Sequence, residues 1–349
     1  MSSRTAIYGS IAASIAFVLE LTLVPLLLPV IQKQLELSIG ELAWVFNSYG
    51  IAVAVGVLVG GWLGDALTAK KVFSAGVLFF AIGSTLVACV DGFELMLAGR
   101  ILQGFGGGVF SPLVPILLTR ASPRRPGRIL IVWGSISGYA AAFAPVLYSR
   151  FFAGSDWSLA FMLLAVVAIA ALLIVHRSPI RGERAVGTPE KTDRSALFRS
   201  SGLWLMFGYV FCTYGGVTFF LFRVPIWLSD HDYQAVSIGF ILSTVWFSFA
   251  LASTLLRNKV DKPTVRSILL VAPVLVATGF QLAFFCNGLV YIALSALFVG
   301  SGLACSNAPS TQAILKFAPK GTGALSASLD ISFARLGGVA TVSVLANSM

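Results

Sequence analysis

Long apolar stretches recur along the whole sequence, and they constrain its fold more than any other feature. Each contains about 20 residues, the number that an α-helix needs to cross the hydrocarbon core of a bilayer. Only 11% of the 349 residues are charged, whereas a soluble domain carries about 25%. The sequence therefore predicts an all-α polytopic membrane protein. We expect eleven spans, at residues 6–31, 42–63, 72–90, 93–118, 129–151, 157–176, 201–222, 237–256, 265–285, 288–314 and 322–346.

A short polar stretch at residues 60–71 (Gly-Gly-Trp-Leu-Gly-Asp-Ala-Leu-Thr-Ala-Lys-Lys) joins the second and third expected spans. Irregular backbone is not tolerated in contact with lipid, so this turn must lie at a membrane surface. Lys70 and Lys71 indicate the cytoplasmic surface, because basic loops are retained in the cytoplasm.

The other basic residues favour the same orientation, with a cytoplasmic N-terminus and with the C-terminus of the given chain outside. In this orientation 19 of the 24 Lys and Arg residues lie in cytoplasmic segments, and the reverse orientation would place them outside. Topology thus accounts for the net charge of +10, and nucleic acid is not expected as a partner. The remaining five basic residues are Lys33, Arg100, Arg150, Arg223 and Arg335.

The polar stretch at residues 177–200 divides the expected spans into six before it and five after it. It contains Pro, Gly and charges of both signs without apolar periodicity, which is typical of a flexible linker. We therefore expect a six-helix bundle at residues 1–176, a cytoplasmic linker at 177–200 and a five-helix bundle at 201–349.

The sequence contains no motif that indicates a metal site, a cofactor or an enzyme. The four cysteines lack metal-ligand spacing, and the two histidines, His176 and His231, are expected at opposite membrane faces. No Walker loop is present, so a transporter with this sequence would draw its energy from a gradient.

Three segments, on expected spans and at the polar turn, carry a family resemblance. They are Leu19-Glu20-Leu21-Thr22 in the first span, Gly61-x-Leu63-x-Asp65 with Lys70-Lys71 in the turn, and Gly99-Arg100-Ile101-Leu102-Gln103-Gly104 in the fourth span. In this order the segments resemble signatures of the major facilitator superfamily, and within it those of the drug:proton antiporters. The resemblance covers residues 20–347.

This resemblance implies a major-facilitator-like two-bundle fold of six and five helices. It also implies proton-coupled export of small amphipathic or hydrophobic molecules by alternating access, in the inner membrane of the cell. The partners would be a small-molecule substrate, protons and the lipid bilayer. Because the family has twelve or fourteen spans, the chain as given would lack its last helix, and either a partner helix or self-association would then cover the gap.

The sequence also departs from the antiporter signatures. Ala66 and Thr68 replace an Arg and a Gly that usually follow the Asp of the turn, and the fifth-span signature is reduced to Ala144-Pro145-Val146-Leu147-Tyr148-Ser149. A facilitator or importer of a small solute therefore remains an alternative function. A truncated membrane protein that does not transport is another.

Ionisable residues inside spans are candidates for function, because each is costly to place in lipid. By helical rise, Glu20 and Arg100 both fall in the outer half of their spans, where they would share a layer. The resemblance gives them roles in proton coupling and substrate binding, and the alternative is an ion pair that only positions the helices. Asp330 and Arg335 also belong to this group, but five residues separate them, so they point some 140° apart on a helix.

Three further groups of candidates follow from the resemblance and from residue type. Asp65 would gate the transport cycle by meeting the start of the eleventh span, or would be a solvated loop residue. Span aromatics would line a substrate cavity, or would face lipid. The gating residues are Gly61, Asp65, Lys70 and Lys71; the packing residues are Gly104, Gly134, Gly138 and Pro145; the cavity aromatics are Tyr49, Tyr209 and Tyr214.

Overall fold

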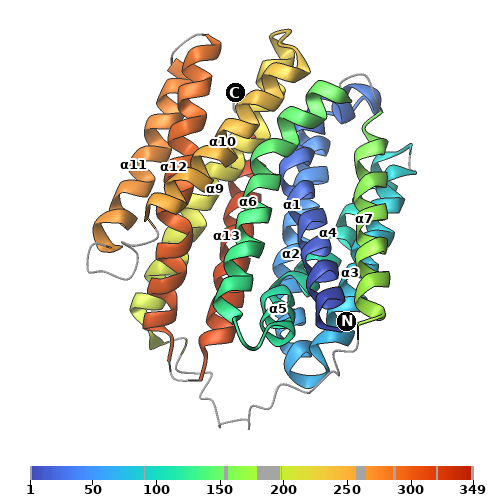
Figure 1. Ribbon diagram of the computed structural model, residues 1–349. Coiled ribbons are helices and arrows are strands. Elements are labelled where there is room, and N and C mark those ends of the chain that lie inside the picture. Colours follow the sequence, from blue (N-terminus) through green and yellow to red (C-terminus); the bar gives the residue numbers. More distant parts are fainter. Residues whose placement is uncertain are drawn as a thin grey trace. The chain divides into compact units, whose positions relative to one another are not determined.

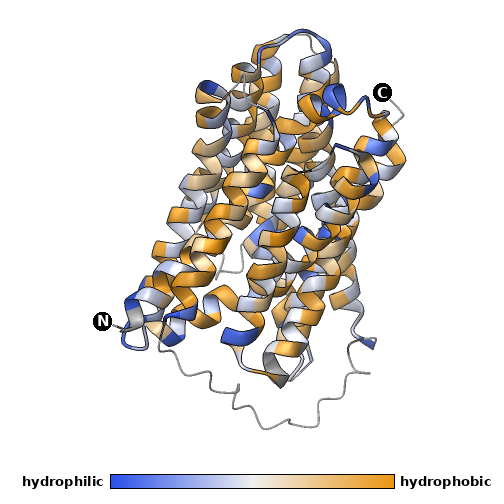
Figure 2. Cartoon of the chain, turned by 90° about the vertical axis from the view of Figure 1, so that its right-hand side faces the viewer, coloured by the Kyte–Doolittle hydropathy of each residue, from blue (hydrophilic) through white to orange (hydrophobic). Residues whose placement is uncertain are grey.

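The structure is a computed structural model that describes residues 2–89, 91–152, 156–178, 197, 199–256, 265–285, 288–319 and 321–346. In this part of the chain the secondary structure is helical and no β-strand is found. Eleven helices are long and apolar enough to cross a membrane, which confirms the predicted number of spans. Figure 2 shows hydrophobic residues along the length of the helices and hydrophilic residues mainly near their ends.

Figure 1 colours the helices in their order along the chain. Their bounds are α1 Ser2–Gln34, α2 Ile39–Ala66, α3 Ala69–Ala88, α4 Phe93–Phe110, the 3₁₀ helix η1 Ser111–Leu113, α5 Val114–Ala121, α6 Pro126–Phe151, α7 Ser158–His176, α9 Ser201–Asp230, α10 Ala235–Leu256, α11 Val265–Phe285, α12 Leu289–Phe317 and α13 Gly323–Leu345.

Local sequence explains where several of these helices begin and break. Ser38 caps α2, because its hydroxyl accepts a hydrogen bond from the Glu41 amide while the Glu41 carboxylate accepts one from the Ser38 amide. The fourth expected span, residues 93–118, is not one α-helix. It is interrupted by η1, because Pro112 in η1 and Pro115 at the start of α5 lack the amide hydrogen that would continue an α-helix.

Contacts divide the chain into two compact units. The first consists of Met1–Leu21, Val30–Ala140 and Ser155–Lys191, and the second consists of Thr22–Pro29, Ala141–Gly154 and Thr192–Met349. The predicted linker at residues 177–200 falls mostly outside the described residues, so its conformation stays a prediction.

In the first unit, α4 is the central helix: α2 and α3 both pack against it, and α7 packs against α3. Glycines allow this close approach. A Cβ atom added at Gly104 would lie 2.5 Å from the Tyr49 carbonyl oxygen, and one at Gly108 would lie 2.9 Å from the Cα of Gly56. Small residues four apart on facing helices are the usual means of close packing in membranes.

In the second unit, α9 packs against α13, and α12 packs against both α10 and α11. Aromatic rings fill part of the α9–α13 contact, where Phe207 and Phe333 stack with ring centroids 4.7 Å apart. This packing places the polar residues of α12 beside α13 and α9.

Candidate functional site

The first candidate site is a buried ion pair between α1 and α4. Arg100 Nη1 lies 2.7 Å from Glu20 Oε1, and each side chain is only 1% exposed. The two side chains, which were expected to share a layer, contact each other directly. The roles of the two residues in coupling stay predictions.

Arg100 contacts two further helices besides α1, and it also contacts Gln103 of its own helix. Its Nη1 donates to the Gln103 side-chain oxygen at 2.6 Å, and its Nε donates to the Val45 carbonyl of α2 at 3.2 Å. The guanidinium lies 4.3 Å from the ring centre of Tyr49 and 5.9 Å from that of Phe161 on α7. The charge is thus held by an ion pair, two neutral acceptors and two aromatic faces.

The polar contacts continue from α4 to α3. The Gln103 amide nitrogen donates to Ser84 Oγ at 2.9 Å, and Ser84 Oγ donates to the Phe80 carbonyl at 2.8 Å. We call Glu20, Arg100, Gln103 and Ser84 the buried polar chain. All four side chains are at most 1% exposed, so the buried polar chain connects α1, α4 and α3 inside the protein.

One atom of the buried polar chain has no partner among the described residues. Glu20 Oε2 is buried and accepts no hydrogen bond, whereas Oε1 carries the ion pair with Arg100. A buried carboxylate oxygen without a donor is costly to place in the protein interior. Glu20 thus uses one carboxylate oxygen in the ion pair and keeps the other buried without a hydrogen-bond donor among the described residues.

The second candidate site lies in the second unit and links α13, α12 and α9. Thr311 Oγ1 donates to Asp330 Oδ2 at 2.6 Å and also lies 3.2 Å from the Asn307 carbonyl oxygen. The Tyr214 hydroxyl donates to the Asn307 side-chain oxygen at 2.7 Å. Asp330 is 6% exposed. No ion pair joins it to Arg335 in the described part of the chain, as their angular separation on the helix predicts.

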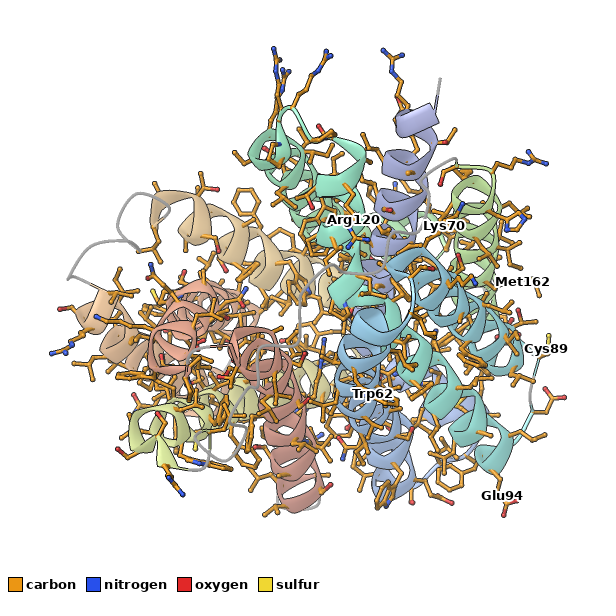
Figure 3. The ribbon with its side chains drawn as sticks, turned by 90° about the horizontal axis from the view of Figure 1, so that it is seen from below. Trp62, Lys70, Cys89, Glu94, Arg120 and Met162 are labelled. Carbon is orange, nitrogen blue, oxygen red and sulfur yellow. The ribbon has the colours of Figure 1, made fainter. Side chains whose placement is uncertain are left out.

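The gating residues are only partly described. The side chain of Asp65 lies outside the described residues, so its expected contact with the start of α13 stays a prediction. Gly61 is part of α2. Lys70, labelled in Figure 3, donates through Nζ to the carbonyl oxygens of His176 at 3.2 Å and Ser178 at 2.6 Å. Lys71 is exposed.

The four packing residues differ in their surroundings. Gly104 lies in the α2–α4 contact, and Pro145 lies where α6 meets α10, with its carbonyl oxygen 2.7 Å from the position of a Cβ on Gly239. A Cβ at Gly134 would meet no described atom within 4 Å. Gly138 is half-buried in α6. The packing role of the last two residues stays a prediction.

The three aromatic candidates are all engaged with protein groups. Tyr49 lies against Arg100, Tyr214 donates to Asn307, and Tyr209 donates to the Leu269 carbonyl at 2.8 Å. Their role as cavity residues stays a prediction.

Several residues of the two sites were not predicted from the sequence. Asn307 and Thr311 carried a usable signal, because two polar residues four apart in an apolar span share one helix face. Ser84 carried none, since a single serine fits a membrane helix without a partner.

Among the described residues no group of three or more His, Cys, Asp and Glu side chains could hold a metal ion.

Comparison with known proteins finds relatives that are named as export proteins. A tetracenomycin C resistance and export protein of Streptomyces glaucescens is 29% identical over 214 residues, which are 60% of this chain and 37% of that protein. A multidrug export protein, EmrB, of Haemophilus influenzae is 27% identical over 158 residues, which are 45% of this chain and 31% of that protein. The chain thus aligns with less than two fifths of the length of either relative.

A solved structure shows the same fold. The crystal structure of a D-xylose-proton symporter superposes with a TM-score of 0.74 at 16% identity, over 99% of this chain and 89% of that chain. The family and these relatives are transporters rather than enzymes. The sequence profile of the Major Facilitator Superfamily matches residues 9–342, which is nearly the whole chain. The chain therefore belongs to the Major Facilitator Superfamily.

Proposed function

We propose that this protein is a secondary transporter that exports small amphipathic or hydrophobic molecules in exchange for protons, by alternating access. The observation that carries the proposal is the buried pair of Glu20 and Arg100, with the unpartnered Glu20 Oε2. An ionisable pair inside membrane helices is expensive and typically marks an ion or substrate pathway.

The geometry supports a way for a proton to change helix packing. When Glu20 gains a proton, its attraction to Arg100 falls, because the carboxyl group becomes neutral. Arg100 keeps Gln103, Val45 and Tyr49 as neighbours, so the contact that weakens is the one between α1 and α4. A proton would thereby favour one arrangement of these helices over another, which is the requirement for coupling.

Asp330 is a second candidate for proton binding. The single hydroxyl hydrogen of Thr311 cannot be given fully to both Asp330 and the Asn307 carbonyl, although both oxygens are within reach. If Asp330 carried a proton, it could donate to Thr311, and Thr311 could donate to Asn307. The site would then be satisfied in both protonation states, with one hydrogen bond reversed.

The direction of transport rests on the relatives, whose names describe export and resistance. Symport or facilitated uptake is the second candidate, because the reduced sequence around Pro145 departs from the antiporter signature and a D-xylose-proton symporter shares the fold.

We further propose a cytoplasmic N-terminus and residence in the inner membrane, with the turn around Asp65, Lys70 and Lys71 as the gate. This proposal does not require self-association.

The test uses the purified chain in proteoliposomes with an imposed pH gradient and a panel of fluorescent amphipathic substrates. Exchange predicts that a proton gradient drives substrate against its concentration gradient and that substrate flow moves protons the opposite way. Substrate and proton flow in the same direction would establish symport instead. Substrate counterflow without any proton movement would reject coupling, and no movement of any compound would favour the protein that does not transport.

A further inference from the structure

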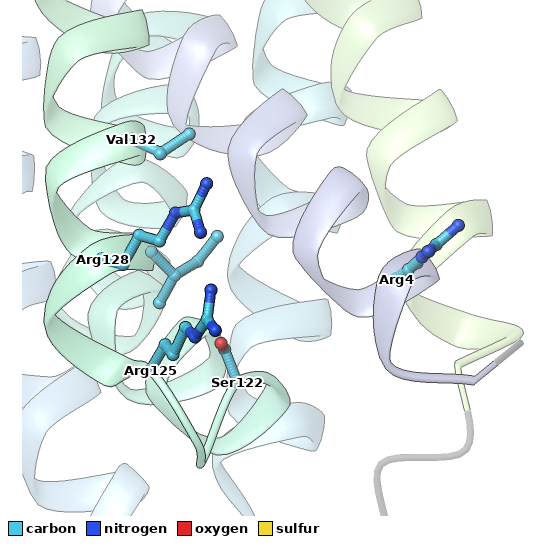
Figure 4. Close-up of a pocket in the computed structure, with 6 residues that line it drawn as sticks. Arg4, Ser122, Arg125, Arg128 and Val132 are labelled. Atoms are coloured by element: carbon cyan, nitrogen blue, oxygen red, sulfur yellow. The ribbon is translucent and has the colours of Figure 1, made fainter.

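The first unit has an arginine-lined cavity that the transport proposal does not use. It lies between the first turns of α1 and α6 and the end of α5, with a volume of about 470 Å³, and Figure 4 shows the side chains on its α6 wall. Its lining residues are Arg4, Ser122, Arg125, Arg128, Ile129 and Val132.

The cavity is positively charged and its charges are not neutralised by described residues. Arg4, Arg125 and Arg128 are exposed, and none of their side chains forms an ion pair or hydrogen bond in the part of the chain that the structure describes. Figure 4 shows Arg125 and Arg128 close together at α6, with Arg4 apart from them on α1. Adjacent guanidinium groups attract a multivalent anion such as a phosphate group, which accepts paired hydrogen bonds from Arg. The hydroxyl of Ser122 adds a neutral donor.

An exposed apolar stripe begins at this cavity and runs along α6. Val132, Ile136 and Tyr139 follow Arg128 at helical spacing, so they lie on the same face of the helix. Their side chains are 40%, 37% and 65% exposed. In the apolar window of α6, 17% of the residues are buried, which is the lowest share among the eleven candidate spans. From Arg128 to Tyr139 the stripe is about 16 Å long at 1.5 Å per residue.

That length matches one leaflet of a bilayer, whose hydrocarbon core is about 30 Å thick in total. A ligand that satisfies both parts of this surface needs an anionic phosphate head and an acyl chain about as long as one leaflet is deep. We propose that the cavity of Arg4, Arg125 and Arg128 is a binding site for the phosphate head of an anionic phospholipid, with its acyl chain along Val132, Ile136 and Tyr139. A free phosphate ion would use only the arginines.

The experiment measures lipid binding by native mass spectrometry of the detergent-purified chain, with thermal shift as a second readout. The probes are phosphatidylglycerol, phosphatidylcholine and glycerol 3-phosphate, the last providing a phosphate head without acyl chains. The test variant is Arg125→Gln with Arg128→Gln. The matched control is Arg124→Gln with Arg177→Gln, which removes the same charge from exposed arginines that do not line the cavity.

Phosphatidylglycerol should bind the unaltered chain and the control, and the test variant should bind it about 30-fold more weakly, given the usual contribution of a basic residue near an anionic surface. Ile136→Ser should also weaken phosphatidylglycerol binding without affecting glycerol 3-phosphate.

Equal losses in the test variant and the control would show diffuse attraction and overturn the site. Glycerol 3-phosphate binding as tight as the lipid, or equal binding of phosphatidylcholine, would overturn the choice of an anionic lipid. All substituted residues are exposed, and a normal melting temperature without lipid confirms that each variant is folded.

Discussion

Glu20 and Arg100 form a 2.7 Å ion pair between α1 and α4 in which both side chains are 99% buried. The pair has opposite consequences for stability and for function. Each charge is tolerated only because the other is present, so either residue is difficult to change alone. The same dependence allows protonation of Glu20 to alter the packing of α1 on α4.

The first prediction separates these two consequences with a double variant. Glu20→Gln leaves the Arg100 charge buried without its counter-charge, and Arg100→Gln does the same to Glu20, so each should lower stability by about 3 kcal/mol or more. Glu20→Gln together with Arg100→Gln removes both charges and should recover most of the loss. Thermal unfolding in detergent measures this, with Glu94→Gln on the exposed first turn of α4 as a control.

Transport of the double variant completes that test. We expect the double variant to be folded but unable to couple proton and substrate movement. Proton-coupled transport at the rate of the unaltered chain in the folded double variant would show that the pair only positions the helices.

The second prediction compares two neighbouring hydroxyl residues on α3. Ser84 is buried and accepts from Gln103, whereas Thr85 is exposed and donates only to the Ala81 carbonyl of its own helix. Ser84→Ala leaves the Gln103 amide without its acceptor and should cost about 1 to 3 kcal/mol. Thr85→Ala should change stability by about 0.5 kcal/mol or less. If both variants melt alike, the contact between Ser84 and Gln103 does not stabilise the fold.

The third prediction concerns the pH dependence of transport. Thr311→Val keeps the size of the side chain but removes the hydroxyl between Asp330 and the Asn307 carbonyl. If Asp330 binds a coupling proton, the transport rate of this variant should vary less with pH than that of the unaltered chain. Thr254→Val, at an exposed threonine that donates to Ala250 in its own helix, is the control. Identical pH profiles for both variants would remove Asp330 from the coupling mechanism.

The fourth prediction tests close helix packing at two glycines. A methyl group at Gly104 would meet the Tyr49 carbonyl oxygen at 2.5 Å, whereas one at Gly134 would meet no described atom within 4 Å. Gly104→Ala should therefore destabilise the protein by about 1 to 3 kcal/mol through overpacking. Gly134→Ala should be neutral or slightly stabilising, because Ala loses less backbone entropy in a helix. A large loss at Gly134 would instead support its predicted role in packing.

Helix positions were predictable from the sequence because a bilayer requires long apolar segments, and that requirement is visible residue by residue. The contact between Glu20 and Arg100 is compatible with helical rise, which places the two residues at similar distances along their expected spans. Pro112 and Pro115 indicate the break in the fourth span. The apolar run continues through both prolines, however, so hydropathy alone does not reveal that the helix is interrupted.

Side-chain partners were less predictable, because they depend on how each helix is rotated about its axis. Nothing in the sequence indicates that Ser84 faces Gln103, or that Thr311 faces Asp330. Long basic residues at span ends are equally ambiguous. Lys70 was assigned to a gate from its position in a family motif, and the structure shows it bound to the end of another helix.

The last prediction follows from this position of Lys70. At the C-terminus of α7 the last carbonyl groups lack helical partners and carry partial negative charge, which a nearby ammonium group stabilises. Lys70 provides that group through its contacts with the carbonyls of His176 and Ser178. It thereby joins the first turn of α3 to the residues that lead into the predicted linker.

Lys70→Met should therefore loosen the end of α7 and cost about 1 kcal/mol. Lys71→Met is the matched control, because Lys71 is exposed and adjacent, has the same charge, and forms no side-chain hydrogen bond or ion pair with the described residues. Hydrogen–deuterium exchange of amides at residues 173–178 measures the effect directly. Faster exchange in the Lys70 variant alone would support the capping role, while equal exchange in both variants would mean that the lysines act only through their charge at the membrane surface.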